Sequence, residues 1–459
     1  MSRAADPARH RRAAATHRAA ARTAVARVAL LALLPLLALG AACGSRLPES
    51  DFASRRPATG TADRAPLRVG IIASATSPVG GEAFTGPRDG ALAYFASLNA
   101  SGGLDGRPVE VLTCDDGGSG VGNNTCFREL VQDREVFALV ATTALDYAAA
   151  PRVSEAGVPD IGGQPIGPAY DTYPHLYSIY GSSAPRTGAS PGWDGVMYGG
   201  TEVYRYFKER EGARTAAVVA YNQSASAAYA RLITEGLRAE GYRVIGEQVD
   251  FALPNFRAVA ADLRAQGADL VFDALDSHGN ARLCEAMDAV GATVTAKVTN
   301  VQNWNSAVPR DYRSAPRCRN ALWVTGSSRN FDETSHPAVR EFREAMDTHM
   351  GDVSLRSQWQ LEGWAAAMWF TDAARSCPAD DLTRECVERF MNRDEPYTAG
   401  GLLLPARFRH LPEPPRTSRA CLSVARWSDT GTGGAGGGWV SQGEMTENCA
   451  TVPQLGYRP

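Results

Sequence analysis

Apolar and polar residues alternate along this chain in two runs that follow the same order of short apolar stretches and amphipathic segments. In the first run, the apolar stretches lie at residues 68–73, 109–113 and 136–141. In the second run, they lie at residues 216–221, 243–249 and 270–274. Strands that alternate with helices predict parallel sheets covered on both faces. We therefore expect an α/β fold in which two doubly wound, Rossmann-like lobes enclose a cleft.

The chain continues beyond the second run with a further strand and two amphipathic helices. The strand is expected at residues 322–326, and one helix starts near His336 and Pro337. The second helix, at about residues 359–374, carries apolar side chains at helical spacing, namely Leu361, Trp364, Met368 and Trp369. Such a stripe is more typical of a hydrophobic core than of a ligand-binding site. Residues 400–439 are expected to form short strands.

The N-terminal 42 residues have the pattern of a signal peptide. An arginine-rich segment precedes the apolar run 28–42, which is too short to span a bilayer comfortably. The run ends in Leu-Gly-Ala-Ala before Cys43, an ending that resembles a bacterial lipobox with Gly40 in place of the usual leucine. We expect lipidation of Cys43, with an ordinary signal peptide as the alternative. Residues 43–65 are rich in Ser, Arg, Pro and Gly and are expected to form a flexible tether.

The length of 459 residues suffices for two or three domains. Without the leader, the chain holds 40 basic and 49 acidic residues, a net charge of about −9. A nucleic-acid binder would be expected to carry a basic face, so this balance argues against such a partner.

Eight cysteines remain when Cys43 is set aside, an even number that suits an oxidising compartment. Sequence neighbours suggest disulfides between Cys114 and Cys126, Cys284 and Cys318, Cys377 and Cys386, and Cys421 and Cys449. Other pairings remain open, because sequence alone does not fix connectivity. Since no CxxC pair or HxxxH spacing accompanies them, we expect no metal site.

Motifs that suggest catalysis lack the context that catalysis requires. Residues 188–192 match the string GxSxG, but no strand precedes them and Pro191 lies inside, so a turn is expected. Asp115 and Asp116 lack the further acidic ligands of a calcium loop. We expect no enzymatic activity and no cofactor.

Four short segments form a recognisable series along the chain: Thr76-Ser-Pro, residues 98–107 (LNASGGLDGR), residues 155–159 (EAGVP) and residues 269–272 (DLVF). Together they resemble the solute-binding proteins of branched-chain amino acid (Leu/Ile/Val) ABC transporters. The resemblance covers roughly residues 66–415 and implies a type I periplasmic-binding fold with a three-crossover hinge. Mapped here, lobe one is expected to comprise residues 66–183 and 326–412. Lobe two is expected to comprise residues 184–325 and 413–459.

Ligands of open parallel sheets bind beyond the carboxyl ends of the strands. In lobe one, Thr142 and Thr143 end the third strand and resemble the hydroxyl pair with which the family holds a ligand carboxylate. Gly163 and Gln164 end the next strand, and their backbone groups are candidates for the same role. Glu82, in the first turn, is a candidate partner for a ligand ammonium group.

In lobe two, the strand ends suggest Tyr221, Ser224, Asp276 and Gln302 as lining residues. The family's acid for the ligand ammonium aligns with Gln302, and its stacking tyrosine aligns with Ala225. A buried ligand ammonium group without a carboxylate partner weakens binding by several kcal/mol. Asp276 is therefore expected to supply that carboxylate if the ligand is an amino acid.

These features predict a monomeric, exported solute-binding lipoprotein on the outer face of the cytoplasmic membrane. It is expected to capture a small polar molecule, such as an amino acid or amide, and to deliver it to an ABC permease. An extracytoplasmic sensor that passes the closed state to a signalling receptor is the alternative, because closure by a ligand serves both functions.

Overall fold

The structure is a computed structural model that describes residues 65–459 except residue 79 and residues 432–435. The predicted signal peptide, Cys43 and nearly all of the predicted tether lie outside the described residues. Within the described ranges, no helix is both long enough and apolar enough to cross a membrane.

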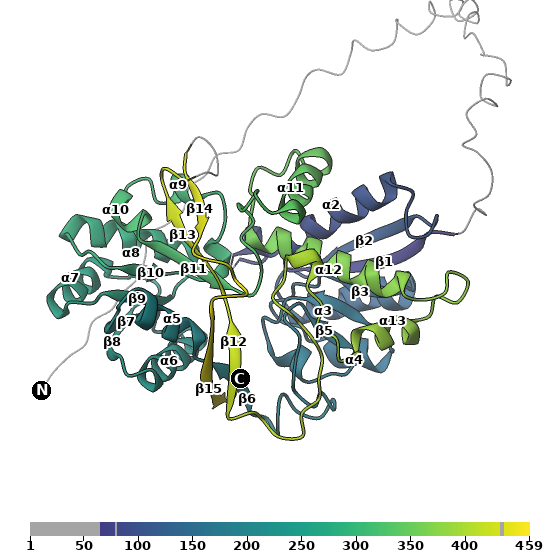
Figure 1. The fold of residues 1–459 in the computed structure, drawn as a ribbon, viewed down its shortest axis with the longest axis horizontal. Coiled ribbons are helices and arrows are strands. Elements are labelled where there is room, and N and C mark those ends of the chain that lie inside the picture. Colours follow the sequence, from purple (N-terminus) through teal and green to yellow (C-terminus); the bar gives the residue numbers. More distant parts are fainter. Residues whose placement is uncertain (1–64, 79, 432–435) are drawn as a thin grey trace, which may run out of the picture. The chain divides into compact units, whose positions relative to one another are not determined.

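Lobe one is built on a five-stranded parallel sheet in the order β2-β1-β3-β4-β5 (Figure 1). Its strands are β1 (Leu67–Ala73), β2 (Val109–Asp115), β3 (Ala138–Val140), β4 (Asp160–Gly163) and β5 (Leu176–Ser178). Its helices include α1 (Gly81–Phe84), α2 (Gly86–Ala100), α3 (Gly120–Phe127), α4 (Ala150–Glu155), α11 (Pro337–His349), α12 (Gln358–Arg375) and α13 (Arg384–Met391). Strands β3 and β4 are wholly buried, as expected for strands covered on both faces.

Lobe two is built on a seven-stranded sheet in the order β14-β13-β11-β10-β9-β7-β8. Its strands are β7 (Thr215–Tyr221), β8 (Arg243–Val249), β9 (Leu270–Ala274), β10 (Ala296–Val298), β11 (Leu322–Gly326), β13 (Ser423–Ser428) and β14 (Gly438–Ser441). Its helices include α5 (Glu202–Arg210), α6 (Ser224–Ala239), α7 (Phe256–Gln266), α8 (Ser277–Val290), α9 (Val308–Asp311) and α10 (Pro316–Arg319). The order β8-β7-β9-β10 repeats the order β2-β1-β3-β4 of lobe one, so the duplicated sequence pattern corresponds to a duplicated topology.

A third sheet, which the sequence pattern did not indicate, is antiparallel. It consists of β12 (Thr417–Cys421), β15 (Cys449–Tyr457) and β6 (Met197–Gly200), with β15 in the centre (Figure 1). The C-terminal segment therefore divides between two sheets: β13 and β14 extend the sheet of lobe two, whereas β12 and β15 pair with each other and with β6.

Helix α12 is part of the core of lobe one. Its residues Leu361, Trp364 and Trp369 are buried, as the sequence pattern predicted. Two glycines allow α12 to lie close to α2: a Cβ on Gly90 would meet the Gln360 carbonyl oxygen at 1.8 Å, and a Cβ on Gly363 would meet the Pro87 carbonyl oxygen at 2.0 Å. A larger residue at either position would force the two helices apart.

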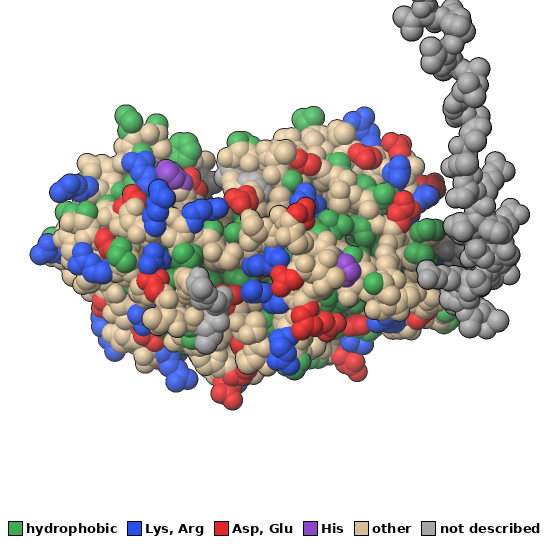
Figure 2. Space-filling view, turned by 90° about the horizontal axis from the view of Figure 1, so that it is seen from above, with side chains coloured by type: hydrophobic (Ala, Val, Ile, Leu, Met, Phe, Trp, Pro, Cys, Tyr) green, Lys and Arg blue, Asp and Glu red, His purple; other side chains and the backbone are tan. Residues whose placement is uncertain are grey.

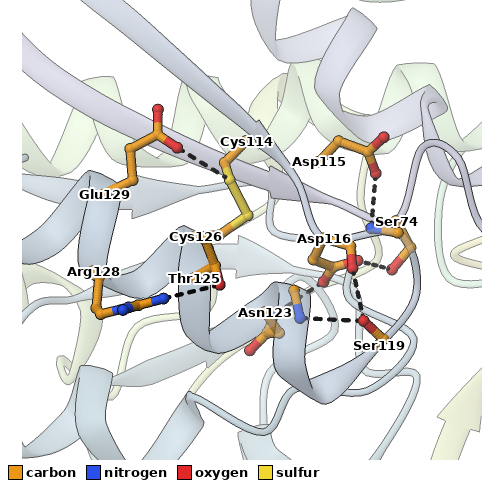
Figure 3. The surroundings of a disulfide bond; sticks show 12 residues. Ser74, Cys114, Asp115, Asp116, Ser119, Asn123, Thr125, Cys126, Arg128 and Glu129 are labelled. Carbon is orange, nitrogen blue, oxygen red and sulfur yellow. Dashed lines mark hydrogen bonds between the residues drawn. A yellow bond between two sulfur atoms is a disulfide. The ribbon is translucent and has the colours of Figure 1, made fainter.

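The described part of the chain contains four disulfides, and the pairs are those that sequence neighbours suggested. They join Cys114 to Cys126, Cys284 to Cys318, Cys377 to Cys386 and Cys421 to Cys449. The first bridge ties α3 to β2 (Figure 3), and the last ties β15 to β12.

Asp116 holds the turn between β2 and α3. It accepts hydrogen bonds from the Ser74 hydroxyl at 2.7 Å, the Gly118 amide at 2.8 Å and the Asn123 side chain at 2.9 Å (Figure 3). Asp115 accepts from the backbone amides of Thr76 and Gly117. These carboxylates thus stabilise a turn, in agreement with the expectation that the pair ends a strand.

Candidate functional site

The residues predicted to bind ligand follow the carboxyl ends of parallel strands in both lobes. Glu82 lies in α1 after β1, the two threonines follow β3, Gly163 ends β4 and Gln164 follows it directly. In lobe two, Tyr221 ends β7, Ser224 begins α6, Asp276 precedes α8, and Gln302 lies in a short 3-10 helix, η4 (Val301–Asn303), after β10. The predicted residues therefore lie at or just after strand ends, as the sequence analysis expected. Their side-chain contacts, in contrast, were not predicted from the sequence.

Thr142 and Thr143 are both fully buried. The Thr143 hydroxyl donates to the Ala141 carbonyl oxygen at 3.3 Å. The Thr142 hydroxyl oxygen has no hydrogen-bond partner among the described residues, and a buried hydroxyl without a partner is destabilising. Their role as a carboxylate-binding pair remains a prediction.

Gln164 links the end of β4 to a buried carboxylate that the sequence analysis missed. Its backbone N–H donates to the Thr142 carbonyl at 2.8 Å, so this amide is already engaged. Its side-chain nitrogen lies 2.5 Å from Oε2 of Glu362, and its side-chain oxygen accepts from the Tyr180 hydroxyl at 3.1 Å. The Gly163 carbonyl accepts from the Ile179 amide at 3.1 Å.

Glu362 is 1% exposed, near the start of α12. The Ser328 hydroxyl donates to it at 2.6 Å, and the Tyr180 hydroxyl lies 3.3 Å from Oε2. Burial raises the pKa of Glu362 to about 7, although these hydrogen bonds lower it. A signal for this site was present in the sequence, because Glu362 is an acid within a segment otherwise expected to be core.

A second buried carboxylate lies behind the threonine pair. Asp160, in β4, accepts from the hydroxyls of Tyr147 at 2.7 Å and Tyr170 at 2.9 Å. Burial raises the pKa of Asp160 to about 6, while the nearby hydroxyl groups of Tyr147, Tyr170 and Thr142 lower it. The Thr142 hydroxyl therefore lies next to this group in the interior of lobe one.

In lobe two, Asp276 caps helix α8. Its carboxylate accepts from the Gly279 backbone amide at 2.6 Å, and the Tyr221 hydroxyl lies 3.4 Å from the same oxygen. Asp276 is exposed, whereas Tyr221 is 7% exposed. The exposed carboxylate can therefore meet a cationic group, and its N-cap bond fixes its position.

A buried ion pair supports the loop that carries Asp276. Nζ of Lys297 lies 2.8 Å from Oδ2 of Asp273, and neither side chain is exposed. Lys297 also contacts Asn280, which donates to the carbonyls of Leu275 at 3.3 Å and Asp276 at 3.1 Å. This network connects the core of lobe two directly to the backbone of the loop.

The first loop of lobe one approaches η4 of lobe two. A Cβ on Gly80 would lie 3.7 Å from Oε1 of Gln302. The pKa of Arg310, in α9, is raised by the adjacent Asp311 and, to a lesser degree, by Glu82. Glu82 and Ser224 are both exposed. Gln302, a predicted site residue of lobe two, thus lies close to Gly80, two residues before the predicted Glu82 of lobe one.

A cavity of about 440 Å³ lies beside Tyr180. Residues that line it include Asp171, Tyr180, Ser182, Trp193, Tyr198, Arg407, Gln454 and Tyr457. None of the nine predicted binding residues lines this cavity. It is formed instead by the segment after β5 and by the strands of the third sheet.

Charged side chains of both signs are interspersed on the face shown in Figure 2. In the described residues, no group of three or more His, Cys, Asp or Glu side chains is placed to hold a metal ion.

Comparison with known proteins identifies the family to which this chain belongs. The sequence profile of the family described as periplasmic binding protein matches residues 66–432. The chain belongs to that family, and its fold is the type I periplasmic-binding fold. It is a solute-binding protein, and family membership implies a location outside the cytoplasm. No curated protein sequence matches the chain.

Solved structures show the same fold at low sequence identity. The branched-chain amino acid transporter substrate-binding protein of Streptococcus pneumoniae, in complex with isoleucine, is 15% identical with a TM-score of 0.59, covering 82% of this chain and 100% of that chain. A fatty acid ABC transporter substrate-binding protein from Thermomonospora curvata is 16% identical with a TM-score of 0.61, covering 86% and 95%. A solute-binding protein of an R. palustris ABC transporter, in complex with benzoate, is 13% identical with a TM-score of 0.60, covering 85% and 97%.

Proposed function

We propose that this chain is an exported solute-binding lipoprotein that captures a small polar ligand between its lobes and delivers it to an ABC permease. Two lobes with the same strand order present their strand ends, and a ligand that contacts both stabilises the closed form. The ligand can shift the free energy of closure by as much as the difference between its binding free energies for the closed and the open form. This duplicated topology is the observation that carries the proposal.

Similar proteins support a ligand that carries a carboxylate. Two of the similar structures were solved in complex with isoleucine and with benzoate, and a third is named for fatty acid transport. Isoleucine, benzoate and fatty acids all contain a carboxylate. Helix N-termini at strand ends offer free backbone N–H groups for such an anion. An amino acid or a related compound therefore remains the ligand class that we propose.

Asp276 is the proposed partner for the ligand's ammonium group, and Thr142, Thr143, Gly163 and Gln164 are the proposed carboxylate side of the site. Tyr221, Ser224, Gln302 and Glu82 complete the proposed lining. The proposal also assigns residues 1–42 to a signal peptide, Cys43 to a lipid anchor and residues 43–65 to the tether.

A thermal-shift screen with amino acids, amides and small carboxylates tests the proposal. A ligand that binds only the folded chain stabilises it by mass action and so raises the melting temperature. At a free ligand concentration of 100 times the dissociation constant, the stabilisation is about 2.7 kcal/mol. We expect saturable stabilisation by at least one amino acid or amide. Failure of every compound in these classes, with calorimetry confirming the absence of binding, would contradict the proposed ligand class.

A further inference from the structure

A second cavity, of about 380 Å³, lies at the amino end of β5. The residues around it include Arg186, Asn392, Asp394, Phe408, Arg409 and His410. Pro174, two residues before β5, also contributes to the lining. Because β5 is parallel to its neighbour in the sheet, its amino end is at the edge opposite to the strand ends proposed to bind solute. This cavity is therefore separate from the proposed solute site.

Arg186 is held rigidly in the wall of this cavity. Its side chain is almost fully buried, and its guanidinium carbon lies 5.0 Å from the ring centre of Tyr177 and 4.7 Å from that of Phe408. Nη1 donates to the Leu176 carbonyl at 2.5 Å. The two rings and this carbonyl fix the plane of the guanidinium group.

The opposite edge of the guanidinium group is poorly satisfied. Nε is buried and has no hydrogen-bond partner among the described residues. Nη2 makes only long contacts, at 3.4 Å to Oδ1 of Asn392 and 3.5 Å to Nε2 of His410. Nε and Nη2 together form the side of an arginine that binds an oxyanion through two parallel hydrogen bonds. Asn392 and His410, which this edge approaches, both line the cavity.

No carboxylate neutralises Arg186 by direct contact within the described ranges. Burial lowers the pKa of Arg186, whereas the adjacent Tyr177 and, without direct contact, Asp171 and Glu388 raise it. Glu388 is engaged elsewhere, at 2.6 Å from Nδ1 of His175 and 3.2 Å from the Tyr177 hydroxyl. A buried cation without an ion pair is costly, so an anion bound in the cavity would remove that cost.

We infer that this cavity is a binding site for a phosphate-class oxyanion, held in two hydrogen bonds by Nε and Nη2 of Arg186. Arg409 and His410 lie at its exposed rim and add positive charge and a donor. The one acid at the rim, Asp394, has a side chain that is 70% exposed and lies 3.8 Å from Arg407. Two arginines against one solvated carboxylate favour a dianion over a monoanion. Burial and the charge of Arg186 lower the pKa of His410, so this histidine serves as a neutral hydrogen-bond donor. This inference does not rest on the proposed transport function.

The test uses the full mature chain and inorganic phosphate, with sulfate and acetate as comparison anions and sodium chloride to hold the ionic strength constant. Thermal shift measures affinity, and the NMR signal of the Arg186 Nε–H reports direct contact. We expect saturable stabilisation by phosphate and sulfate, a shift of that signal, and weaker binding of acetate. Binding of acetate as tight as that of phosphate would overturn the assignment to a dianion.

Variants separate this site from non-specific salt effects. Arg186→Lys keeps the positive charge but removes the paired Nε and Nη2 donors, and we expect it to weaken phosphate binding by about 10-fold or more. Arg238→Lys, an exposed arginine on α6, is the matched control and should leave affinity unchanged. Equal affinity in the two variants would overturn the inference. If Arg186→Lys does not fold, Arg409→Gln and His410→Ala replace it, and unchanged phosphate affinity in both would be equally decisive.

Discussion

The side-chain nitrogen of Gln164 lies 2.5 Å from Oε2 of Glu362, and this contact joins the end of β4 to the start of α12. The two residues are 198 positions apart in the sequence. Gln164 belongs to the proposed solute site, whereas Glu362 lies behind it in the interior. The orientation of a proposed binding residue therefore depends on a buried carboxylate that titrates near neutral pH.

Glu362→Gln is expected to change how stability depends on pH. Burial raises the pKa of Glu362 to about 7 in the folded chain, so the folded form holds its proton more tightly than the unfolded form. Its contribution to stability is therefore greatest at low pH and falls as pH rises toward 7, by about 2 to 3 kcal/mol between pH 5 and pH 8. Urea unfolding at both pH values should show that this fall is absent in the variant.

Glu344→Gln, on the exposed face of α11, is the control for this comparison and should retain the pH dependence of the wild type. Other buried acids also contribute to the overall profile, so the relevant quantity is the difference between each variant and the wild type. A Glu362→Gln profile parallel to that of the wild type would show that Glu362 does not titrate as described.

Lys297→Met is expected to destabilise the chain strongly. The substitution leaves Asp273 buried without its cation, and breaking a buried ion pair in this way costs about 3 to 5 kcal/mol. The double variant Lys297→Met with Asp273→Leu should recover much of that loss, because it removes both charges. Urea unfolding measures all three free energies.

Lys208 provides a matched control, since it is the only other lysine in the chain. It is partly buried and contacts the Glu240 carbonyl without a carboxylate partner in the described structure. Lys208→Met should cost about 1 kcal/mol or less. Similar losses for the two lysine variants would argue against a special role for the buried pair.

The disulfides are expected to differ in how much they stabilise the fold. The bridge between Cys284 and Cys318 has a sequence separation of 34, and that between Cys377 and Cys386 a separation of 9. Loop-closure entropy then predicts about 4 kcal/mol for the longer loop and about 2.5 kcal/mol for the shorter one. Replacing each pair with alanines and measuring unfolding under oxidising conditions tests this order. Peptide mapping without reduction should recover all four bridges, and a mixed pairing would contradict the structure.

Much of the fold was predictable because strong local patterns specify it. The strands at residues 243–249, 270–274 and 322–326 have the bounds that their apolar runs indicated. The third sheet was not predictable, because β6 pairs with β15 from the far end of the chain. Both strands contain few fully buried positions, and their pairing depends on contacts between distant segments.

The candidate site was predictable in position and not in detail. Strand ends located Thr142 and Gln164, since parallel strands of one sheet end at the same edge. Sequence gave no indication that the Gln164 amide is engaged with Thr142, or that the Thr143 hydroxyl donates to Ala141. Such contacts depend on the exact path of the backbone and on side chains from α12, which no local pattern encodes.

Asp276→Asn separates the two roles of Asp276. Asparagine caps helices about as well as aspartate, so the bond to the Gly279 amide should persist and the melting temperature should change little. The variant nevertheless loses the negative charge proposed to meet the ligand's ammonium group. We therefore expect the affinity for an amino acid identified by the screen to fall by about 10-fold or more, measured by calorimetry.

Two further variants complete this test. Asp276→Ala removes both the charge and the cap, so it should lose the same affinity and, in addition, about 1 kcal/mol of stability. Asn255→Ala removes the equivalent cap of α7, where the side chain accepts from the Ala258 amide, and should lose stability without losing affinity. If Asp276→Asn binds the amino acid as tightly as the wild type, then Asp276 is a helix cap alone, and the carboxylate for the ligand's ammonium group must come from another residue such as Glu82.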